Sequence, residues 1–392
     1  MDATKFCSNW EQLLIEIDST CRSFDSTWQK RRRIVDTKIV VLFILQLFNG
    51  RELKNYSTAL SNVWLFFKGK NSAKPRKLEP VVASTICDAR QKIDESIFVL
   101  LNKKVLDVFE SQATLEQRLW RGLTLFAVDG SKVNLPAITG ELGFDVMTKD
   151  KARPQGLLSC LYNVTQQVPV DFMLESHGDE RLCALDHLKK CPLNSLVIYD
   201  RGYMSYQLLK AHSDRGIFGL FRIQKGSFAV FQEFIDNPNS PTEQIVEVIP
   251  TRQSQKDIKS KNGVVDFYPI KVRLMRYSIA EKQYYLATTL LDSEIEVDEF
   301  ARNYHGRWAI EELYKKSKSI LNMESFHSKT LRGIRQEIFA SLFLVTLTRI
   351  LTNQGESMHL SECSNDKKKA LRKTKPHWKK AFRHFKSISN RH

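Results

Sequence analysis

The stretch LTLFAVDG, residues 123–130, decides the fold because the sequence pattern changes there. It is a short apolar run that ends in Asp129, and it predicts a core strand. Residues 1 to about 115 read as helical instead, with apolar side chains at helical intervals such as Ile86, Ile93, Ile97, Leu101, Val105 and Phe109. The chain therefore changes from helical to strand-containing structure near residue 116.

The segments after Asp129 predict a mixed sheet. GLLSCLYNV (156–164) and VPVDFML (168–174) flank TQQ and predict a hairpin, and LNSLVIYDRGY (193–203) predicts a buried strand that ends in Asp200. ERLCALDHLKKC (180–191) and SYQLLKAH (205–212) predict helices, and IFGLFRI (217–223) predicts another strand. The predicted order is therefore three strands, helix, strand, helix, strand. Strands that alternate with helices indicate an α/β sheet covered on its faces.

The rest of the chain is divided by composition. Three helices are predicted at Trp10 to Cys21, Arg32 to Phe48 and Tyr56 to Phe67. A fourth predicted helix is capped by Ser84 or Thr85 and runs through to Phe109. Residues 225–292 are rich in strand patterns and predict an all-β insertion, and the apolar helix at 337–351 should pack on the sheet. The predicted regions are a helical DNA-binding domain at 1–115, a first core part at 116–224, the insertion at 225–292, a second core part at 293–355 and a basic tail at 356–392.

The charge of the chain indicates a polyanionic partner. Its 392 residues carry 60 Lys and Arg against 44 Asp and Glu, a net charge of +16. Such an excess attracts nucleic acid, although a membrane surface or a basic tail that only aids solubility would also account for it. The tail from Lys367 to His392 contains eleven Lys and Arg by count and no acidic residue. We expect nucleic acid as the partner and rank a membrane role low, because the tail lacks a sustained apolar face.

The sequence gives no sign of secretion or membrane insertion. Residues 1–12 have no signal-peptide pattern, and the apolar run 39–48 is too short to span a bilayer and contains Gln46. Seven cysteines are spread along the chain without a C-x-x-C pair, which predicts a reducing compartment and neither a disulfide framework nor a zinc site. The pair His187 and Cys191 has helical spacing, and we expect it to serve packing. We predict a cytoplasmic protein.

The stretch YHGRWAIEELYKKSK, residues 304–318, places polar groups on one side of a helix. Wound at 3.6 residues per turn, Arg307, Glu311 and Lys318 fall within about 60° of Tyr304. The opposite side carries residues that a core could bury, namely Ile310, Leu313, Tyr314, Ile320 and Leu321. One carboxylate held among two cations and a phenol indicates a site for an anion or a metal.

Three carboxylates from distant segments would complete such a site. Asp129 and Asp200 end two core strands, and Glu311 belongs to a helix that could lie beside those ends. Carboxylates brought together repel one another unless cations are present. Hard oxygen ligands without His or Cys suit Mg²⁺ or Mn²⁺, and two such ions can cleave a phosphodiester. Taken alone, each acid reads as a turn, cap or surface residue, so the hypothesis depends on the three together.

These residues resemble the DDE transposases of bacterial insertion sequences, in the insertion sequence four type. Tyr304, Arg307, Glu311 and Lys318 match the Y-x2-R-x3-E-x6-K signature of that subgroup in type and spacing. VDGS around Asp129 and YDRGY around Asp200 match the surroundings of the two aspartates of the family. The resemblance runs from about residue 80 to 350 and includes FHSKTLRGIRQEIFASLF (326–343).

The resemblance implies a fold, a reaction and a set of roles. The fold would be a ribonuclease-H-like mixed sheet with a β-rich insertion. Two Mg²⁺ or Mn²⁺ ions on Asp129, Asp200 and Glu311 would support cleavage at terminal inverted repeats of double-stranded DNA, a hairpin step and strand transfer into target DNA. Tyr304, Arg307 and Lys318 would grip phosphates. The family also implies a homodimer on paired ends, in a bacterial cytoplasm and associated with the nucleoid.

Two alternatives and one departure remain at this point. The chain could be a catalytically silent DNA-binding relative, or a simple metal-dependent nuclease of the same fold that releases ends without joining them. Related enzymes receive a flipped base on a tryptophan of the insertion, and residues 225–292 contain no Trp. The hairpin step is therefore less well supported than metal-dependent cleavage.

Overall fold

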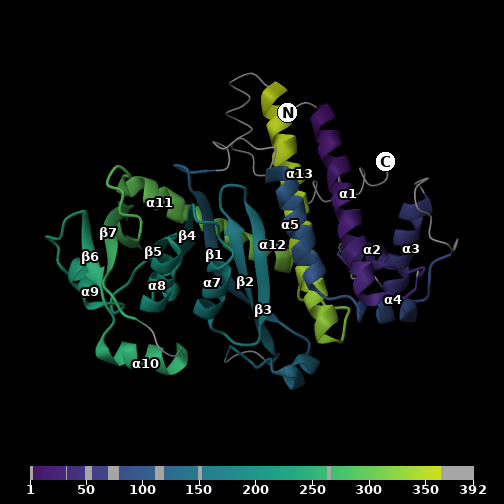
Figure 1. Ribbon diagram of the computed structural model, residues 1–392, viewed down its shortest axis with the longest axis horizontal. Helices are drawn as coiled ribbons and strands as arrows, with labels where there is room; N and C mark the ends of the chain where they lie inside the picture. The colour runs from purple at the N-terminus through teal and green to yellow at the C-terminus, as the bar shows by residue number, and fades with distance from the viewer. Residues whose placement is uncertain are drawn as a thin grey trace.

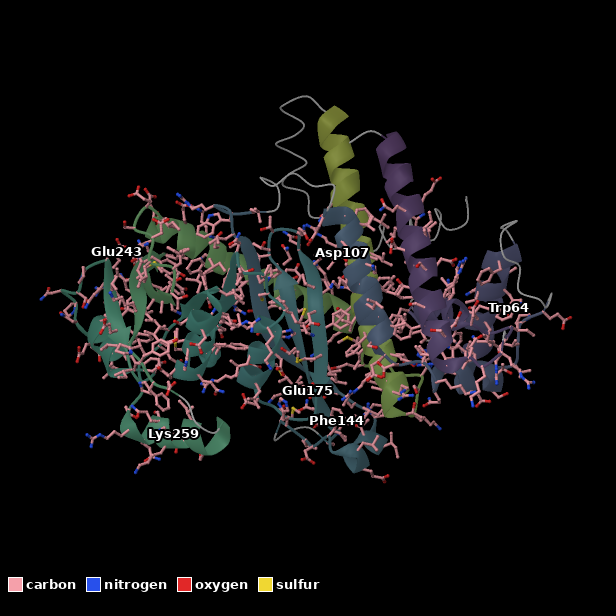
Figure 2. All side chains as sticks on the ribbon, in the orientation of Figure 1. Trp64, Asp107, Phe144, Glu175, Glu243 and Lys259 are labelled. Carbon is pink, nitrogen blue, oxygen red and sulfur yellow. The ribbon has the colours of Figure 1, made fainter. Side chains whose placement is uncertain are left out.

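The computed structural model describes residues 3–31, 33–48, 55–68, 79–110, 119–148, 152–262 and 266–362. The sequence KGKNSAKPRK (68–77) predicts a basic loop, and all of it after Lys68 lies outside the described residues, as does the basic tail from Lys367. Figure 1 shows a central sheet with helices on its faces and a group of helices at one end. In Figure 2, Glu243 at one end of the molecule and Trp64 at the other mark this span from the insertion to the N-terminal helices.

The sheet has eight strands in the order β3-β2-β1-β4-β5-β8-β7-β6. β1, β2 and β3 are antiparallel, β1, β4 and β5 are parallel, and β8, β7 and β6 continue antiparallel from β5. The first five strands have the order of a ribonuclease-H-like sheet, which confirms the predicted fold class. The strand bounds are β1 Thr124–Asn134, β2 Gln155–Asn163, β3 Val168–Glu175, β4 Ser195–Tyr199, β5 Phe218–Arg222, β6 Glu243–Val248, β7 Ile270–Ile279 and β8 Lys282–Thr288.

Alternating side chains of β1 pack against different helices on the two faces of the sheet. Phe126 and Val128 join a cluster with α7 (Glu180–Leu188) and α8 (Tyr206–Arg215). Leu125 and Ala127 join a cluster with α11 (Val297–Gly306). This alternation follows from the two-residue repeat of a strand, and it covers both faces of the parallel strands.

The segment 225–292 is not all-β, contrary to the prediction. It contains α9 (Ala229–Asp236) and α10 (Arg252–Asn262) besides β6, β7 and β8. The stretch FAVFQEF (228–234) is rich in aromatic residues and has the composition of a strand, but Phe231 and Phe234 lie three residues apart on the buried side of α9. The strands of this segment also extend the central sheet, since Phe221 of β5 pairs with Ala287 of β8.

The N-terminal region is helical as predicted, with different boundaries. α2 begins at Thr37 and not at Arg32, because the Asp36 side chain accepts a hydrogen bond from the Ile39 amide and caps the helix. The single helix predicted through Phe109 is two helices, and the Asp94 carboxylate accepts from the Ser96 amide at the start of the second. The bounds are α1 Ala3–Trp28, α2 Thr37–Leu47, α3 Tyr56–Lys68, α4 Ala83–Arg90 and α5 Ser96–Glu110.

The cap predicted for the fourth helix is also wrong. The N-cap residue of α4 is Val82, and no side-chain capping hydrogen bond is made there by the described residues. Ser84 and Thr85 lie inside the first turn of α4. Tertiary packing therefore fixes the start of this helix, since Ile86 is fully buried.

The long helix α13 (Leu331–Glu362) joins the N-terminal helices to the sheet, and it extends beyond the predicted range on both sides. It packs on β3, as predicted, and also on α5 and α2. One hydrophobic cluster includes Phe98 of α5, Leu158 of β2 and Phe343 of α13. The division of the chain into domains remains a prediction, because this core is continuous across the predicted boundary near residue 115.

The predictions for the apolar run 39–48 and for His187 with Cys191 agree with the structure. The run forms most of α2, whose side chains are largely buried. Within the described ranges, no helix has the length and apolar character needed to cross a membrane. Free thiols are found at Cys21, Cys87, Cys160, Cys183 and Cys191. His187 and Cys191 are both buried.

Candidate active site

Asp129 lies in the middle of β1 and not at its end, which corrects the prediction. The strand continues to Asn134, and Asp129 pairs with Cys160 of β2. Gly130 pairs with Ser159 within the same ladder, so the Asp-Gly pair is extended backbone instead of a turn. The hydrogen-bonded ladder with β2 overrides the local turn tendency of this dipeptide.

Asp200 follows β4 directly, as predicted, and lies close in register to Asp129. The parallel pairing of β1 and β4 places Ala127 opposite Ile198, and each aspartate is two residues further along its strand. β4 ends at Tyr199, whereas β1 continues beside β2 to Asn134. One edge of β1 from Asp129 onward is therefore free of strand pairing in the described structure. We call this edge the notch; Asp200 lies at its start.

The helix carrying Glu311 is interrupted at Arg307, where a single helix was predicted. α11 ends at Gly306, and α12 (Trp308–Ser319) begins after Arg307. The Arg307 amide donates to the Tyr304 carbonyl, and the Ile310 amide donates to the Arg307 carbonyl, both with the tighter i to i−3 spacing. At Gly306, a Cβ would lie 2.7 Å from Val164 Cγ1, so glycine lets the helices approach the sheet closely.

The polar stripe of these helices faces the sheet. Tyr304 and Arg307 are buried, while Glu311 keeps 42% of its side chain exposed. The apolar residues predicted to face the core are buried at Ile310, Leu313, Tyr314 and Leu321, as expected. Ile320 is only partly buried. Glu312 is exposed and pairs with Lys315 at 3.0 Å, so it points away from the site.

Tyr304 and Arg307 connect the three predicted carboxylates. The Tyr304 hydroxyl donates to Asp200 Oδ1 at 3.0 Å. Arg307 Nη1 lies 3.5 Å from Asp129 Oδ2, and Nη2 donates to Glu311 Oε1 at 2.7 Å. Asp129, Asp200 and Glu311 thus belong to one network of contacts, although their segments are up to 182 residues apart (311 − 129) in the sequence.

Lys318 is held along the same strand. Its Nζ donates to Ser131 Oγ at 2.9 Å and to the Lys132 carbonyl at 2.5 Å, and it lies 3.8 Å from Glu324 Oε1. Burial lowers the pKa of Lys318, and the negative charge of Glu324 opposes that shift. The ammonium group is therefore fixed beside the notch on the Glu311 side.

The charges of the network are not balanced at Asp129. Burial raises the pKa of Asp129 to about 7, and the carboxylates of Glu180 and Glu311 add to that rise. The Arg307 guanidinium and the Gly130 amide act in the opposite direction but do not offset burial. For Arg307, burial alone would lower the pKa, but the neighbouring Tyr304, Asp129, Asp200 and Glu311 raise it.

Two residues near the site were missed by sequence reasoning. Tyr314, interpreted only as a core residue, donates its hydroxyl to the Asp129 carbonyl at 2.8 Å and to the Leu158 carbonyl at 3.1 Å. Glu180 begins α7 and raises the pKa of Asp129 by its charge. An acid in the first helical turn is ordinary in sequences, so nothing in the pattern marked Glu180.

The donor set fits a hard divalent cation. The acids available are carboxylates without Cys or His, which is the ligand type that Mg²⁺ and Mn²⁺ prefer. Burial, together with the charges of Glu180 and Glu311, raises the pKa of Asp129, and a bound cation would favour its ionised form. In the described part of the chain, no group of three or more His, Cys, Asp or Glu already closes on a metal position. Arg307 bridges Asp129 and Glu311, so a cation bound by both would compete with its guanidinium.

The chain is similar to a known protein family and to solved structures. The family model described as Transposase DDE domain matches residues 120–347. No curated protein matches the chain. Among solved structures, a cryo-electron-microscopy structure of the piggyBac transposase synaptic complex with hairpin DNA is similar at 10% identity, over 97% of this chain and 78% of that chain, with a TM-score of 0.45. The family match covers more than half of the chain, includes every strand and contains Asp129, Asp200 and Glu311, so the protein belongs to the DDE transposase family.

Proposed function

We propose that the protein is an insertion-sequence transposase that cleaves and joins DNA by metal-dependent phosphodiester chemistry. The observation that carries the proposal is the contact network in which Tyr304 and Arg307 connect Asp200, Asp129 and Glu311 at one edge of β1. Family membership supports the reaction class, since this family generally uses divalent metal ions. Two Mg²⁺ or Mn²⁺ ions would be held by Asp129, Asp200 and Glu311.

Each residue of the site would contribute a separate physical effect. When bound, the divalent ions supply an activated water and stabilise the departing oxygen. Asp129 is kept in place by the β1–β2 ladder, and its backbone carbonyl by Tyr314. The Tyr304 hydroxyl is already committed to Asp200, so we assign Tyr304 to orienting that carboxylate instead of gripping a phosphate.

The two cations of the stripe would bind the DNA backbone. Lys318 has three donors and uses two of them on Ser131 and Lys132, and the third faces Glu324 at 3.8 Å, from which it would turn to a phosphate oxygen. Arg307 would move its guanidinium from the carboxylates to a phosphate when a divalent ion takes its place. Arginine and lysine contacts of this kind fix the register of a duplex without reading its sequence. The net charge of +16 supports a DNA partner.

The finer features of the reaction are part of the same proposal. The substrates would be terminal inverted repeats and target DNA, bound by a homodimer in the bacterial nucleoid. The piggyBac complex contains hairpin DNA. For a hairpin step in this chain, an aromatic side chain must receive a displaced base. The insertion contains no tryptophan. Trp308, which follows Arg307 and is 56% exposed, would supply an aromatic surface for this base.

The decisive experiment compares two neighbouring glutamates. Glu311→Gln should abolish Mg²⁺-dependent or Mn²⁺-dependent nicking of a DNA end, by about 10³-fold or more, while DNA binding is retained. Glu312→Gln is the matched control, because Glu312 is exposed and pairs with Lys315 outside the network. Equal cleavage by wild type and Glu311→Gln would refute the assignment of this carboxylate.

A strand-transfer assay with labelled target DNA tests the second half of the reaction. A transposase gives joined products from pre-cleaved ends with a free 3′-hydroxyl. Cleavage of ends without any joined product would indicate that the protein is a simple metal-dependent nuclease of the same fold. Binding without cleavage across several candidate ends would leave a catalytically silent relative.

A further inference from the structure

Glu180 lies at the start of α7, on the opposite face of the sheet from Glu311. Asp179 caps the helix by accepting from the Arg181 and Leu182 amides, which places Glu180 in the first turn. α7 packs against β1, β2 and the short 3₁₀ turn η2 (Arg201–Tyr203) that follows Asp200. The Glu180 charge is close enough to Asp129 and Asp200 to interact with both.

Gly130 makes room for this side chain. A Cβ at position 130 would lie 3.0 Å from Glu180 Oε1, 3.1 Å from Glu180 Cγ and 2.8 Å from Leu157 Cδ1. Gly130 is extended in β1, so its backbone does not require a glycine for any turn. The missing side chain instead lets the Glu180 carboxylate lie directly on β1, one residue from Asp129.

The other end of α7 is anchored in the core. His187 lies between Ser159 of β2 and Asp171 of β3, with Nε2 3.1 Å from Ser159 Oγ and Nδ1 2.8 Å from Asp171 Oδ2. Lys190 donates to the second Asp171 oxygen at 2.8 Å. Ser159, His187 and Asp171 have the order of a hydrolase triad, but all three are buried and no substrate could reach them. Their effect is to fix α7, and with it Glu180, against the sheet.

Tyr203 provides a second observation at the same place. Its side chain is 1% exposed, and its hydroxyl faces the Glu180 carboxylate closely enough to interact with it, in a geometry too loose for a full hydrogen bond. The charges that act on this hydroxyl most strongly are Glu180 and Asp129. Tyr203 therefore faces Glu180 at the α7 side of β1. Because its hydroxyl is not fully hydrogen-bonded there, a polar group bound beside Glu180 would complete its hydrogen bonding.

We propose that Glu180 is a fourth carboxylate of the active site, a positioning residue that strengthens divalent-cation binding at Asp129 and Asp200 through the water shell of the cation. The open edge of β1 makes this possible, because Glu311 reaches it from the α12 face and Glu180 from the α7 face. Carboxylates around a metal that act through its water ligands commonly change affinity by about 10- to 100-fold. The inference rests on the proposed metal site and adds a residue to it.

The test measures Mn²⁺ binding to the full-length protein without DNA, by electron paramagnetic resonance of the free ion. Glu180→Gln should weaken Mn²⁺ binding about tenfold or more. Asp186→Asn is the matched control, since Asp186 is exposed on the same helix and pairs with Lys189; its affinity should equal that of wild type. Asp129→Asn serves as the reference for the site itself and should weaken binding more strongly.

Each outcome separates this inference from the proposed function. Unchanged Mn²⁺ affinity in Glu180→Gln, with a strong loss in Asp129→Asn, overturns the role of Glu180 and leaves the metal site intact. Unchanged affinity in both variants overturns both. A loss in Glu180→Gln and none in Asp186→Asn supports the inference.

A second measurement guards against a purely structural effect of Glu180. In the cleavage reaction, Glu180→Gln should raise the Mg²⁺ concentration for half-maximal rate about tenfold, and the rate at saturating Mg²⁺ should stay within a few-fold of wild type. A lower saturating rate with an unchanged Mg²⁺ dependence would mean that Glu180 only supports the fold, and it would overturn the proposal.

Discussion

Two buried arginines of this protein, Arg90 and Arg307, illustrate opposite uses of the same chemistry. Arg90 is 2% exposed, and all its nitrogens are bonded: to Gln336 Oε1 at 3.1 Å, to the Tyr56 hydroxyl at 2.7 Å, and to the Gly333 carbonyl and Glu337 Oε1 at 3.0 and 2.9 Å. Arg307 is also buried, at 5% exposed, yet its Nε has no partner among the described residues, and its contact with Asp129 is long at 3.5 Å.

The acids beside the two arginines differ in the same way. Burial acts to raise the pKa of Glu337, but hydrogen bonds from His327 and the charge of Arg90 outweigh it, and the pKa is lowered. At Asp129 burial prevails, and the pKa rises to about 7. A fully paired cluster stabilises a fold, whereas an underpaired one keeps the capacity to bind something else. The comparison separates a structural arginine, Arg90, from Arg307, for which we propose a functional role.

The largest expected effect concerns Arg90. Arg90→Met should lower the free energy of unfolding by about 3–5 kcal/mol, because it leaves Glu337 buried and unpaired. Arg307→Met should cost clearly less, since Glu311 can turn into water and Asp129 can take up a proton. Urea denaturation of both variants measures the difference. Equal losses would contradict the comparison, and the double replacement Arg90→Met with Glu337→Met should recover part of the loss.

A smaller effect of opposite sign is expected at Asp129. Its pKa of about 7 lies above the ordinary 3.8, so ionising Asp129 costs folding free energy as the pH rises from about 4 to 7, and the full cost applies above pH 7. Asp129→Asn should therefore stabilise the protein at pH 8, by roughly 1–3 kcal/mol, and the gain should vanish as the pH falls toward 4. Melting temperatures at pH 8 and 5 measure it. A gain that stays constant with pH would contradict this origin.

The smallest effect is expected at Tyr314. Tyr314→Phe removes two hydrogen bonds to the carbonyls of Asp129 and Leu158 but keeps the ring in its pocket. The expected loss is about 1 kcal/mol in the free energy of unfolding, with cleavage reduced less than by Glu311→Gln. A loss of cleavage as large as that of Glu311→Gln would contradict a purely structural role and would mean that Tyr314 takes part in the reaction.

The sequence predicted the part of the fold that depends on local patterns. The hairpin at TQQ, the buried strand before Asp200 and the core side of the Glu311 helix follow from hydrophobic spacing and turn residues, which act within a few residues. The prediction of an all-β insertion was wrong because FAVFQEF satisfies both strand and helix patterns, and because the residues of α10 are almost all polar and show no helical apolar pattern.

Residue types, and the spacing within 304–318, selected the candidate site residues, whose catalytic roles stay a prediction. In the structure, Asp129, Asp200, Glu311, Arg307 and Tyr304 are joined by contacts. The interruption at Arg307 could not be predicted, because it accompanies the approach of Gly306 to Val164, a contact between segments far apart in the sequence. Glu180 could not be predicted either, since only its position over Gly130 distinguishes it from an ordinary acid of a helix start.

The continuous core under α13 has a practical consequence for making shortened proteins. The stretch that matches the family, residues 120–347, ends inside α13 and leaves out α5, against which that helix lies. A fragment starting at residue 120 would expose to water the side of Phe343 that packs against Phe98. It would also leave Glu337 without its ion-pair partner Arg90. Recombinant production of a minimal enzyme should therefore retain residues 83–110, and the N-terminal helices belong in any truncation series as part of the folding unit.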